Sequence, residues 1–500
     1  MVQNSRNRSF LICVLLLQLH TLAVSCVGDA QAPRLIRRQE TYVSGRVLIK
    51  YRQGATELTL PAKAEEFDLQ PSELSCGSVR VYRVRPGTEL EAAATLALDP
   101  SVEYAEPDYL IFAAGSVAKS PALAFPAPTL GRPDAESRSL SRSEWAADAP
   151  NDPLYDKQWA LSKIEAEGAW KISGGNDITI AVIDSGTDLD HPEFTGRIVD
   201  GYDFVNGDDE ADDDYGHGTQ VAGVAAAAAN NDLGIAGLAW DAKIMPVKVL
   251  DNRGRGMSSN LTCALYWVAD KGAHVVNISI ISFGPSLGMQ SAINYAVEED
   301  MLVFAAAGNL FEEGNPITYP AALEGVVAVA ASDKEDGHAW FSSAGSFVDI
   351  AAPGVSIFSP FPPSHDEFRS VYGTSLASPH GAGLAALILS VAPSLQPLEV
   401  EGIIQESAAD LGDAGRDDKF GHGRVDAQAA MELTLSSLPE QLFLPSAQFP
   451  SPTPADTPTP TGTPSETTTG TPTPTGTPSE TATPTPTPSS TLSPTPDSSG

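Results

Sequence analysis

Short apolar runs that alternate with helical stretches restrict the fold of residues 150–433 more than any other feature of this sequence. Residues 178–183 (ITIAVI) and 302–307 (LVFAAA) are two such runs. Strands of a parallel sheet are buried on both faces and therefore give continuous apolar runs, and strands separated by helices indicate such a sheet. The pattern predicts an α/β fold with a doubly wound sheet, in a segment long enough for one large core.

A smaller α/β unit precedes this segment. Residues 47–51 and 79–84 are predicted strands, and residues 90–98 form a short alanine-rich helical pattern. Residues 113–148 then change to Pro, Ala, Ser and charged residues without periodicity, which is typical of a linker. We therefore expect a small domain at 33–112, followed by this linker.

The N-terminus has the features of an export signal, predicted over residues 1–32. Arg6 and Arg8 precede an apolar run, and Ala23-Val24-Ser25 forms a small-residue cleavage site. Cys26 follows directly, so the stretch also resembles a bacterial lipobox in which this cysteine is acylated. Both interpretations take the protein out of the cytoplasm, either as a secreted, extracellular protein or as one attached to the cell envelope.

Residues 434–500 form a Pro/Thr-rich tail of low complexity. Between residues 451 and 500 there are 13 Pro and 18 Thr, and TPTPTGTPSET occurs at 457–467 and again at 471–481. Such a composition cannot bury a core and predicts an extended, disordered segment. It leaves open whether the tail has no function or acts as a spacer at the cell envelope.

Charge and cysteine content exclude several classes of protein. The chain has 30 Lys and Arg against 64 Asp and Glu, a net charge of −34, whereas binding nucleic-acid phosphates needs a dense basic surface. The four cysteines are too few and too scattered for a disulfide framework or a cysteine zinc site. Cys263 lies in an apolar helical pattern and is expected to be a buried thiol.

Four short segments of the large domain carry candidate catalytic residues. Asp184 and Asn309 each follow an apolar strand, where open parallel sheets place their ligand sites. His217 and Ser375 each open a predicted helix. Taken singly, each residue is as well explained as a turn residue or a helix cap.

Together these residues supply the parts that nucleophilic catalysis by serine requires. Serine attacks only if a base takes its proton, and a histidine oriented by a carboxylate is such a base. An asparagine amide beside a backbone N–H stabilises the oxyanion that then forms. The combination is far more specific than any one of the four segments.

At these positions the chain resembles the subtilisin-like serine proteases (subtilases, peptidase family S8), and most of all their thermitase branch. The similarity covers nearly all of residues 150–433, including Asn151-Asp152-Pro153 at the start and Gly421-His422-Gly423 near the end. The resemblance implies that Ser375 is the nucleophile and that His217 is the general base, which later acts as acid. It also implies that Asp184 is the carboxylate that orients His217 and that Asn309 is the oxyanion donor.

The resemblance also implies the fold and the domain organisation. The expected architecture at 149–433 is a subtilisin-like doubly wound, mostly parallel sheet with helices on both faces. It would be preceded by a small α+β propeptide domain and followed by the disordered Pro/Thr-rich tail. Residues 33–112 would be that inhibitory propeptide, with the sequence EYAEPDY at 103–109 near its end, and maturation would cut within 113–148.

Two chain edges bind the substrate strand by antiparallel pairing in this family. Gly254-Arg255-Gly256 agrees with the family's Gly-x-Gly, and Gly308 lets a substrate backbone approach closely. At the other edge, Ser279-Ile280-Ile281, isoleucine replaces a glycine at position 281. A β-branched side chain there is predicted to intrude on the pocket for the residue before the scissile bond. A local shift of three residues, to Ser282-Phe283-Gly284, is the alternative.

Calcium is the cofactor that the resemblance implies, and no organic cofactor is expected. Closely spaced carboxylates and carbonyls supply the six to eight oxygens that a hard cation needs. The expected tighter site uses side chains of three residues and backbone oxygens of three more: Asp152, Glu193 and Asn231, with Ala228, Leu233 and Ile235. A solvated acidic loop explains a second candidate site equally well. The ligands of that site would be Asp203, Asn206, Asp208 and Asp212.

The sequence therefore predicts a secreted subtilisin-like serine endopeptidase that hydrolyses peptide bonds through an acyl-enzyme on Ser375. It would be a self-processing precursor and a monomer, with polypeptides as substrates and its own propeptide as inhibitor. The alternative is a surface-displayed subtilase scaffold with weak or no catalysis, which the departure at Ile281 favours. An esterase or lipase is disfavoured because the Gly-x-Ser-x-Gly motif is absent at Ser375.

Overall fold

The structure of the chain is a computed structural model that describes residues 41–55, 62–115, 149–362 and 367–438. The predicted export signal and the tail beyond residue 438 lie outside the described residues. Helix α10, Ala427–Ser437, continues past residue 433. Residues 434–437 therefore belong to the large domain and not to the tail, which corrects the predicted boundary.

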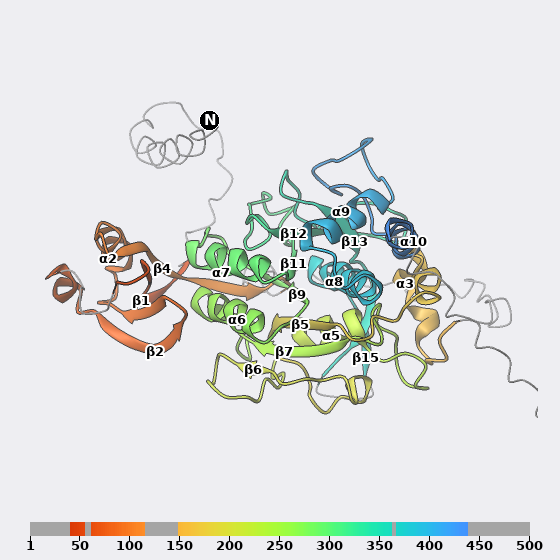
Figure 1. Ribbon diagram of the computed structural model, residues 1–500, viewed down its shortest axis with the longest axis horizontal. Coiled ribbons are helices and arrows are strands. Elements are labelled where there is room, and N and C mark those ends of the chain that lie inside the picture. The colour runs from red at the N-terminus through yellow and green to blue at the C-terminus, as the bar shows by residue number, and fades with distance from the viewer. Residues whose placement is uncertain (1–40, 56–61, 116–148, 363–366, 439–500) are drawn as a thin grey trace, which may run out of the picture. The chain divides into compact units, whose positions relative to one another are not determined.

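A seven-stranded parallel sheet forms the centre of the large domain (Figure 1). Its strand order is β13-β12-β11-β9-β5-β7-β6, and all its pairs are parallel. The strands are β5 (Thr179–Asp184), β6 (Tyr202–Asp203), β7 (Lys243–Lys248), β9 (Val275–Ile278), β11 (Leu302–Ala306), β12 (Val326–Ser332) and β13 (Ile350–Pro353). The two apolar runs of the sequence become β5 and β11, so the predicted parallel sheet is confirmed.

Helices cover both faces of this sheet, because alternate residues of each strand enter two different cores. In β5, Ile180 and Val182 pack with helices α5, α8, α9 and α10, whereas Ala181 and Ile183 pack with α6 and α7. The long helices are α5 (His217–Ala226), α6 (Ser258–Asp270), α7 (Leu287–Glu298), α8 (Thr374–Val391) and α9 (Pro397–Ser407). Among the described helices, α8 is long and apolar enough to cross a membrane, but 89% of it is buried inside the protein.

Shorter elements complete the large domain. Two short helices, α3 (Trp159–Lys163) and α4 (Ala166–Trp170), lie near its start. Two 3-10 turns are η5 (Tyr155–Lys157) and η6 (Pro192–Phe194). Strands β14 (Ile357–Pro360) and β15 (Phe368–Val371) form an antiparallel pair.

The N-terminal unit is a small α+β domain with its own core. It contains β1 (Tyr42–Tyr51), η2 (Ala62–Phe67), β2 (Gln70–Cys76), β3 (Val79–Arg83), α2 (Glu89–Leu96) and β4 (Val102–Ala113). Its strands pair antiparallel, and side chains such as Val47 and Leu96 fill the core beneath them. The strands and the helix that the sequence predicts here are present.

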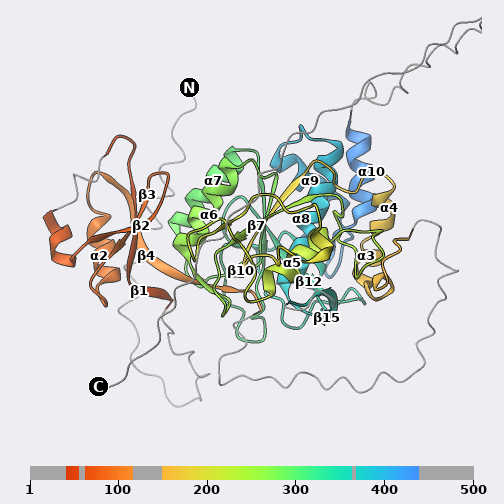
Figure 2. The ribbon, with the colours of Figure 1, turned by 90° about the horizontal axis from the view of Figure 1, so that it is seen from below.

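Strand β4 continues beyond this small domain and enters the large one (Figure 2). Its last residues pair antiparallel with β8 (Arg255–Met257) on one side and with β10 (Ile280–Ile281) on the other. Residues 113–115 were predicted as the start of a linker. That boundary is wrong, because Ala113 ends β4 and Ala114 continues its hydrogen bonding to the large domain.

A disulfide joins the small domain to the large one. Cys76, at the end of β2, is bonded to Cys263 in α6, and their Cα atoms are 5.2 Å apart. The predicted free thiol at Cys263 is therefore wrong. Spacing along the chain did not indicate the pair, because the two cysteines are 187 residues apart.

Candidate active site

Asp184 and His217 meet at the carboxyl edge of the parallel sheet. Asp184 is the last residue of β5, and His217 is the first residue of α5. His217 Nδ1 lies 2.7 Å from Asp184 Oδ1, and both side chains are buried. Since a carboxylate only accepts hydrogen bonds, this contact places a proton on Nδ1 and leaves Nε2 of the neutral ring to accept one.

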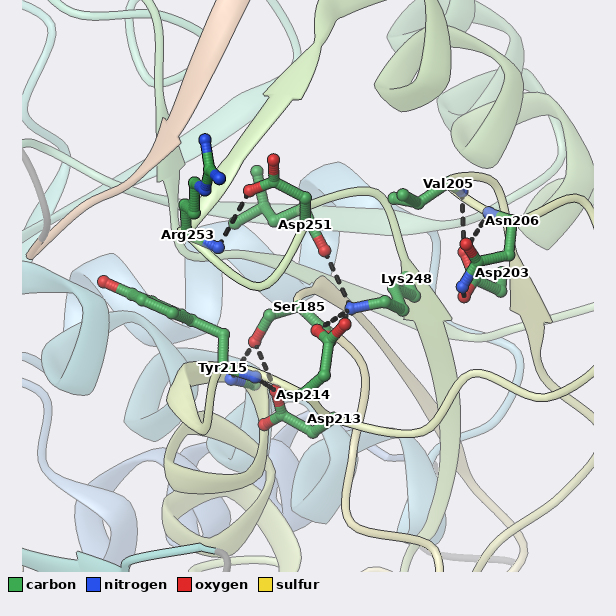
Figure 3. Close-up of polar contacts among 12 residues, drawn as sticks. Ser185, Asp203, Val205, Asn206, Asp213, Asp214, Tyr215, Lys248, Asp251 and Arg253 are labelled. Atoms are coloured by element: carbon green, nitrogen blue, oxygen red, sulfur yellow. Dashed lines mark hydrogen bonds and ion pairs between the residues drawn. The ribbon is translucent and has the colours of Figure 1, made fainter. Parts of the chain in front are cut away.

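Asp213 is a second carboxylate beside this pair, and the sequence analysis gave it no role. It accepts hydrogen bonds from Ser185 Oγ and Tyr215 N, which Figure 3 shows, at 2.8 and 3.0 Å. It also accepts from Gly216 N and Thr219 N, at 2.7 and 2.9 Å, so it anchors the residues on both sides of His217. Burial lowers the pKa of His217, but the charge and hydrogen bond of Asp184 and the charge of Asp213 outweigh it, and the pKa is raised. Burial also raises the pKa of Asp213. The acidic run immediately before His217 was the available signal.

Lys248 is a buried cation at the same edge that sequence reasoning also missed. It ends β7, next to Asp184 in the register of the sheet. Its Nζ donates to the backbone oxygens of Ser185 and Leu250 and to Asp214, as Figure 3 shows. A lysine in an apolar strand pattern does not by itself indicate a functional residue. In the structure, Lys248 fixes the turn that follows Asp184.

Ser375 stands on the first turn of α8, a helix that is buried along almost its whole length. Its backbone oxygen accepts a hydrogen bond from Ser279 Oγ at 2.8 Å. Ser279 in turn accepts from Asn277, which accepts from Ser378 at 2.7 Å. This chain of hydrogen bonds ties α8 to the end of β9, and Asn277 and Ser378 are further residues that sequence reasoning missed.

Each of the three residues Asp184, His217 and Ser375 has one buried polar atom without a hydrogen-bond partner: Asp184 Oδ2, His217 Nε2 and Ser375 Oγ. Buried polar atoms are usually paired, so such exceptions point to function. His380, one helical turn further on, is different. Its Nδ1 contacts the Leu376 carbonyl and burial lowers its pKa to about 4, so it packs inside the protein as a neutral side chain.

The Asn309 side chain is held in one orientation by Thr374. The backbone N–H and the hydroxyl of Thr374 both donate to Asn309 Oδ1, each at 2.9 Å. Because an N–H can only donate, the amide NH2 of Asn309 must point the other way. A Cβ on Gly373 would lie 2.8 Å from Ser375 Oγ and 3.2 Å from Asn309 Nδ2, so both groups border the same space.

The last residues of β4 occupy this space. Ile111 pairs with Gly256, and Ala113 N donates to Gly254 O at 3.0 Å. On the other side, Ala114 N donates to Ser279 O at 2.9 Å. The amide of Asn309 donates to the carbonyl oxygen of Ala114.

The two predicted edges thus lie on either side of one extended segment. Ile280 and Ile281 pair with that segment, whereas Ser282 pairs with Tyr319. The alternative register shifted by three residues is therefore wrong. Gly308, with φ of 105°, precedes Asn309, and a Cβ there would lie 2.9 Å from Ser343 Oγ.

Three side chains of the first predicted calcium site come together. Asp152 accepts from the backbone N–H of Asn231 at 3.3 Å, and the amide of Asn231 donates to Glu193 at 3.1 Å. Burial raises the pKa of Glu193 to about 7, and the nearby charge of Asp152 adds to that. The backbone of Ile235 and Leu233 enters the same cluster, through N–H groups that donate to Glu193 and Asn231, and Ala228 N bonds to the Glu193 carbonyl.

The side chains of this cluster are of the type that a hard cation binds. Asp152 and Glu193 are buried and Asn231 lies between them, without a basic side chain among the contacts described above, and their oxygens accept hydrogen bonds from the surrounding N–H groups. Within the described ranges no group of three or more His, Cys, Asp or Glu forms a metal cluster. The predicted calcium site has only two such side chains, Asp152 and Glu193, because its other predicted ligands are an amide and backbone carbonyls.

The residues of the second predicted site are only partly gathered. Asp203 accepts from the backbone and side chain of Asn206, and Asp208 bonds to the Asp203 backbone (Figure 3). Asp212 instead accepts from Leu189 N at 3.2 Å. The oxygens of Asp203 are thus used by its own loop.

Comparison with known proteins identifies the family of this chain. The model of the Subtilase family matches residues 175–423. Thermitase from Thermoactinomyces vulgaris is 40% identical over 285 residues, which are 57% of this chain and 99% of that protein. The chain belongs to the subtilase family. Subtilases are serine endopeptidases, and they act on polypeptides.

Two further relatives extend the match toward the N-terminus. The thermophilic serine proteinase of Bacillus sp. (strain AK1) is 35% identical over 395 residues, 78% of this chain and 88% of that protein. Fervidolysin from Fervidobacterium pennivorans, whose crystal structure is described as that of a keratinolytic enzyme related to subtilisin, superposes with a TM-score of 0.65 at 26% identity. That match covers 78% of this subtilase but only 61% of the fervidolysin chain.

Proposed function

We propose that this subtilase is a serine endopeptidase made as a self-processing precursor, with Asp184, His217 and Ser375 as its catalytic triad. One observation carries the proposal. A segment of the chain itself is paired with both substrate edges, and its Ala114 carbonyl accepts the hydrogen bond of Asn309. A peptide bond that follows a carbonyl held in this way is poised for attack, so Ala114–Gly115 is the bond first cut.

Each residue of the site has its own role in the proposed reaction. Ser375 Oγ attacks the carbonyl carbon of the bound residue while His217 Nε2 takes the hydroxyl proton. Asp184 keeps the ring oriented and stabilises the imidazolium. Asn309 donates to the oxyanion of the tetrahedral intermediate. His217 then protonates the leaving amine, and water releases the acyl group from Ser375 by the same steps in reverse.

The small domain at 41–114 is the inhibitory propeptide of this scheme. Two of its carboxylates bind the amino ends of helices in the large domain. Glu106 accepts from Leu287 N and Gly288 N of α7, at 2.7 and 2.9 Å, and burial raises its pKa to about 7. Asp108 accepts from Ser259 N of α6 at 3.0 Å. Carboxylates at helix amino ends are favourable partners, so these contacts hold β4 in the site.

Calcium is proposed as a structural cofactor at the site of Asp152, Glu193 and Asn231. A bound calcium ion there would neutralise the two buried carboxylates and so stabilise the large domain. Backbone oxygens of Ala228, Leu233 and Ile235 would complete the ligand set. The loop of Asp203, Asn206, Asp208 and Asp212 remains a second candidate.

Export from the cytoplasm is part of the proposal. Besides the predicted signal at 1–32, the Cys76–Cys263 disulfide supports it, because such bonds persist in oxidising compartments. Attachment to the cell envelope, through Cys26 or through the tail, stays a prediction, as does the monomeric state.

The experiment compares residues 33–500 with the same chain carrying Ser375→Ala, both incubated with calcium. Intact mass after reduction is followed over time. We expect the parent to yield a fragment that begins at Gly115, while the Ser375→Ala chain stays whole. If both chains fold and stay whole, the proposed function is wrong and the binding-scaffold alternative replaces it. If the parent is cut elsewhere in 113–148, the scissile bond is wrong.

A further inference from the structure

We infer that the site selects a small side chain, of the size of alanine, at the residue whose carbonyl is attacked. Ile281 and Leu310 are the residues that set this preference. The inference rests on the proposed function and names its substrate class. It is carried by the packing around Ala114.

The Ala114 side chain fills a closed apolar pocket. It packs with Ile281, Ala306 and Leu310, and all four side chains are at least 96% buried. Interiors of this kind have few voids, and forcing in a larger group displaces side chains or backbone. A phenylalanine in place of Ala114 would therefore collide with Ile281 or Leu310.

Ile281 cannot easily withdraw from the pocket. Its backbone belongs to β10, and the next residue, Ser282, exchanges two hydrogen bonds with Tyr319, at 2.6 and 3.0 Å. A β-branched side chain also has few alternative rotamers. The pocket is thus limited by a side chain on a fixed backbone.

The first test measures kcat/KM of the dithiol-activated protein for peptides that differ only in the residue before the scissile bond. We expect the parent to prefer alanine over phenylalanine by at least tenfold. Ile281→Gly should reverse or abolish that ratio, whereas the matched variant Ile281→Val should keep it. A parent that cleaves after phenylalanine as readily as after alanine overturns the inference, and so does an unchanged ratio in Ile281→Gly.

A second test needs no catalysis. In the Ser375→Ala chain, Ala114→Phe should lower the Tm, and adding Ile281→Gly should restore it, because residue 114 occupies the pocket in the full chain. No effect of Ala114→Phe overturns the size limit. If the rescue is seen while no peptide is cleaved by any variant, the pocket stands and the proposed function is wrong.

A second inference comes from a different observation, the disulfide between the two domains. We propose that cleavage of Ala114–Gly115 does not release the small domain, which stays attached and inhibitory until a dithiol reduces Cys76–Cys263. This regulation of the proposed site follows from connectivity: Cys76 lies before the cut and Cys263 lies after it. After cleavage the disulfide is the covalent link between the two fragments.

A tether of this kind keeps the inhibitor at high effective concentration. Linked groups rebind as if present at roughly millimolar concentration, independent of dilution. In the cleaved protein Glu106 still reaches the amino end of α7 and Asp108 still reaches that of α6, because both residues lie before the cut. Cutting and activation are therefore separate steps.

Reduction proceeds by two thiol–disulfide exchanges. The first thiolate of the dithiol attacks Cys76 Sγ, because Cys76 is partly exposed whereas Cys263 is only 2% exposed. The S–S bond breaks and its electron pair leaves on Cys263, which takes up a proton. The second thiol of the reagent displaces Cys76 from the mixed disulfide. Two electrons and two protons pass to the protein, and the dithiol becomes a disulfide.

The test follows the self-processed protein on denaturing gels and with a short peptide substrate. We expect one covalent species without reductant and two fragments with dithiothreitol, which should raise the activity at least tenfold. The control Cys76→Ser/Cys263→Ser should be fully active on dilution and indifferent to dithiothreitol. A parent whose fragments separate without reductant, or which then equals the control in activity, overturns the tether.

One further arm separates this inference from the proposed function. In the Ser375→Ala chain, a site for an unrelated sequence-specific protease is placed within 116–148 and cut. If the pieces stay joined on a non-reducing gel while the parent has no activity in any state, the tether stands and the proposed function fails. If they separate, the tether is wrong whatever the parent does.

Discussion

Removal of Asp108 should weaken the binding of the small domain more than any other single change on β4. This side chain is fully buried and accepts four hydrogen bonds. The donors are Ser258 Oγ, Ser259 N, Ser259 Oγ and Arg46 Nε, at 2.7–3.0 Å. Asp108→Ala leaves the hydroxyls of Ser258 and Ser259 and the N–H of Ser259 without this partner, as well as the partly exposed guanidinium of Arg46.

The expected magnitude follows from these contacts. The ion pair with Arg46 lies within the small domain, so the loss on binding comes from the three hydrogen bonds that Ser258 and Ser259 of α6 donate. Hydrogen bonds to a charged group contribute about 1.5–3 kcal/mol each, so losing these is expected to cost about 4 kcal/mol in all. A loss of about 4 kcal/mol corresponds to a dissociation constant roughly 10³-fold higher. Asp108→Asn keeps an acceptor for Ser259 N but loses the charge that strengthens the hydrogen bonds from α6, so its effect should be intermediate.

The assay uses the Cys76→Ser/Cys263→Ser background, in which the cleaved small domain is free to leave. The processed complex is diluted serially, and activity on a short peptide gives the dissociation constant. Glu103→Ala is the matched control, because it removes the same charge from the same strand. Glu103 is 44% exposed and its ion pair with Lys50, at 3.3 Å, lies within the small domain, so the change should be at most about fivefold. Equal effects of Asp108→Ala and Glu103→Ala would refute the reasoning.

Three further predictions concern the large domain. Asn309→Ala should lower kcat by about 10²–10³ with little change in KM, the magnitude typical of this donor in subtilisins; steady-state kinetics on the dithiol-activated protein will show it, and an unchanged kcat contradicts the oxyanion role. The pKa of His217 is raised and its neutral form is the base, so kcat/KM should fall as the pH drops through a value above 6.5. Asp213→Asn should move this fall in kcat/KM to lower pH, and a fall at unchanged pH contradicts the influence of Asp213 on His217. Chelating calcium should lower the Tm, by the equivalent of about 3 kcal/mol if the ion was present at 100 times its dissociation constant, and Asp152→Asn should remove most of that difference in a thermal melt.

Local patterns in the sequence were sufficient for the main fold and for the parts of the site. The runs at 178–183 and 302–307 became β5 and β11, because strands buried on both faces must be apolar throughout. Asp184, His217, Asn309 and Ser375 stood out at the ends of predicted strands and helices, and the resemblance to the subtilases gave them their expected roles. Parallel strands all end at one edge, so these ends converge.

Other features depended on contacts between distant segments. Asp213 and Lys248 acquired a role only when the turn after β5 packed against α5 and β7. The insertion of Ala114 between two edges and the pairing of Cys76 with Cys263 join segments more than a hundred residues apart. Sequence reasoning placed Ala114 in a linker and left Cys263 as a thiol.

The sequence by itself determined which elements form and which residues can do chemistry, because periodicity and capping are properties of neighbouring residues. The sequence also predicted that Ile281 intrudes on a substrate pocket, but only the tertiary structure decided what it contacts: its side chain packs with Ala114, a residue 167 positions earlier in the chain. The tertiary structure likewise decided that the small domain is covalently held. Both are consequences of packing between surfaces, and packing has no signature in any short stretch of sequence.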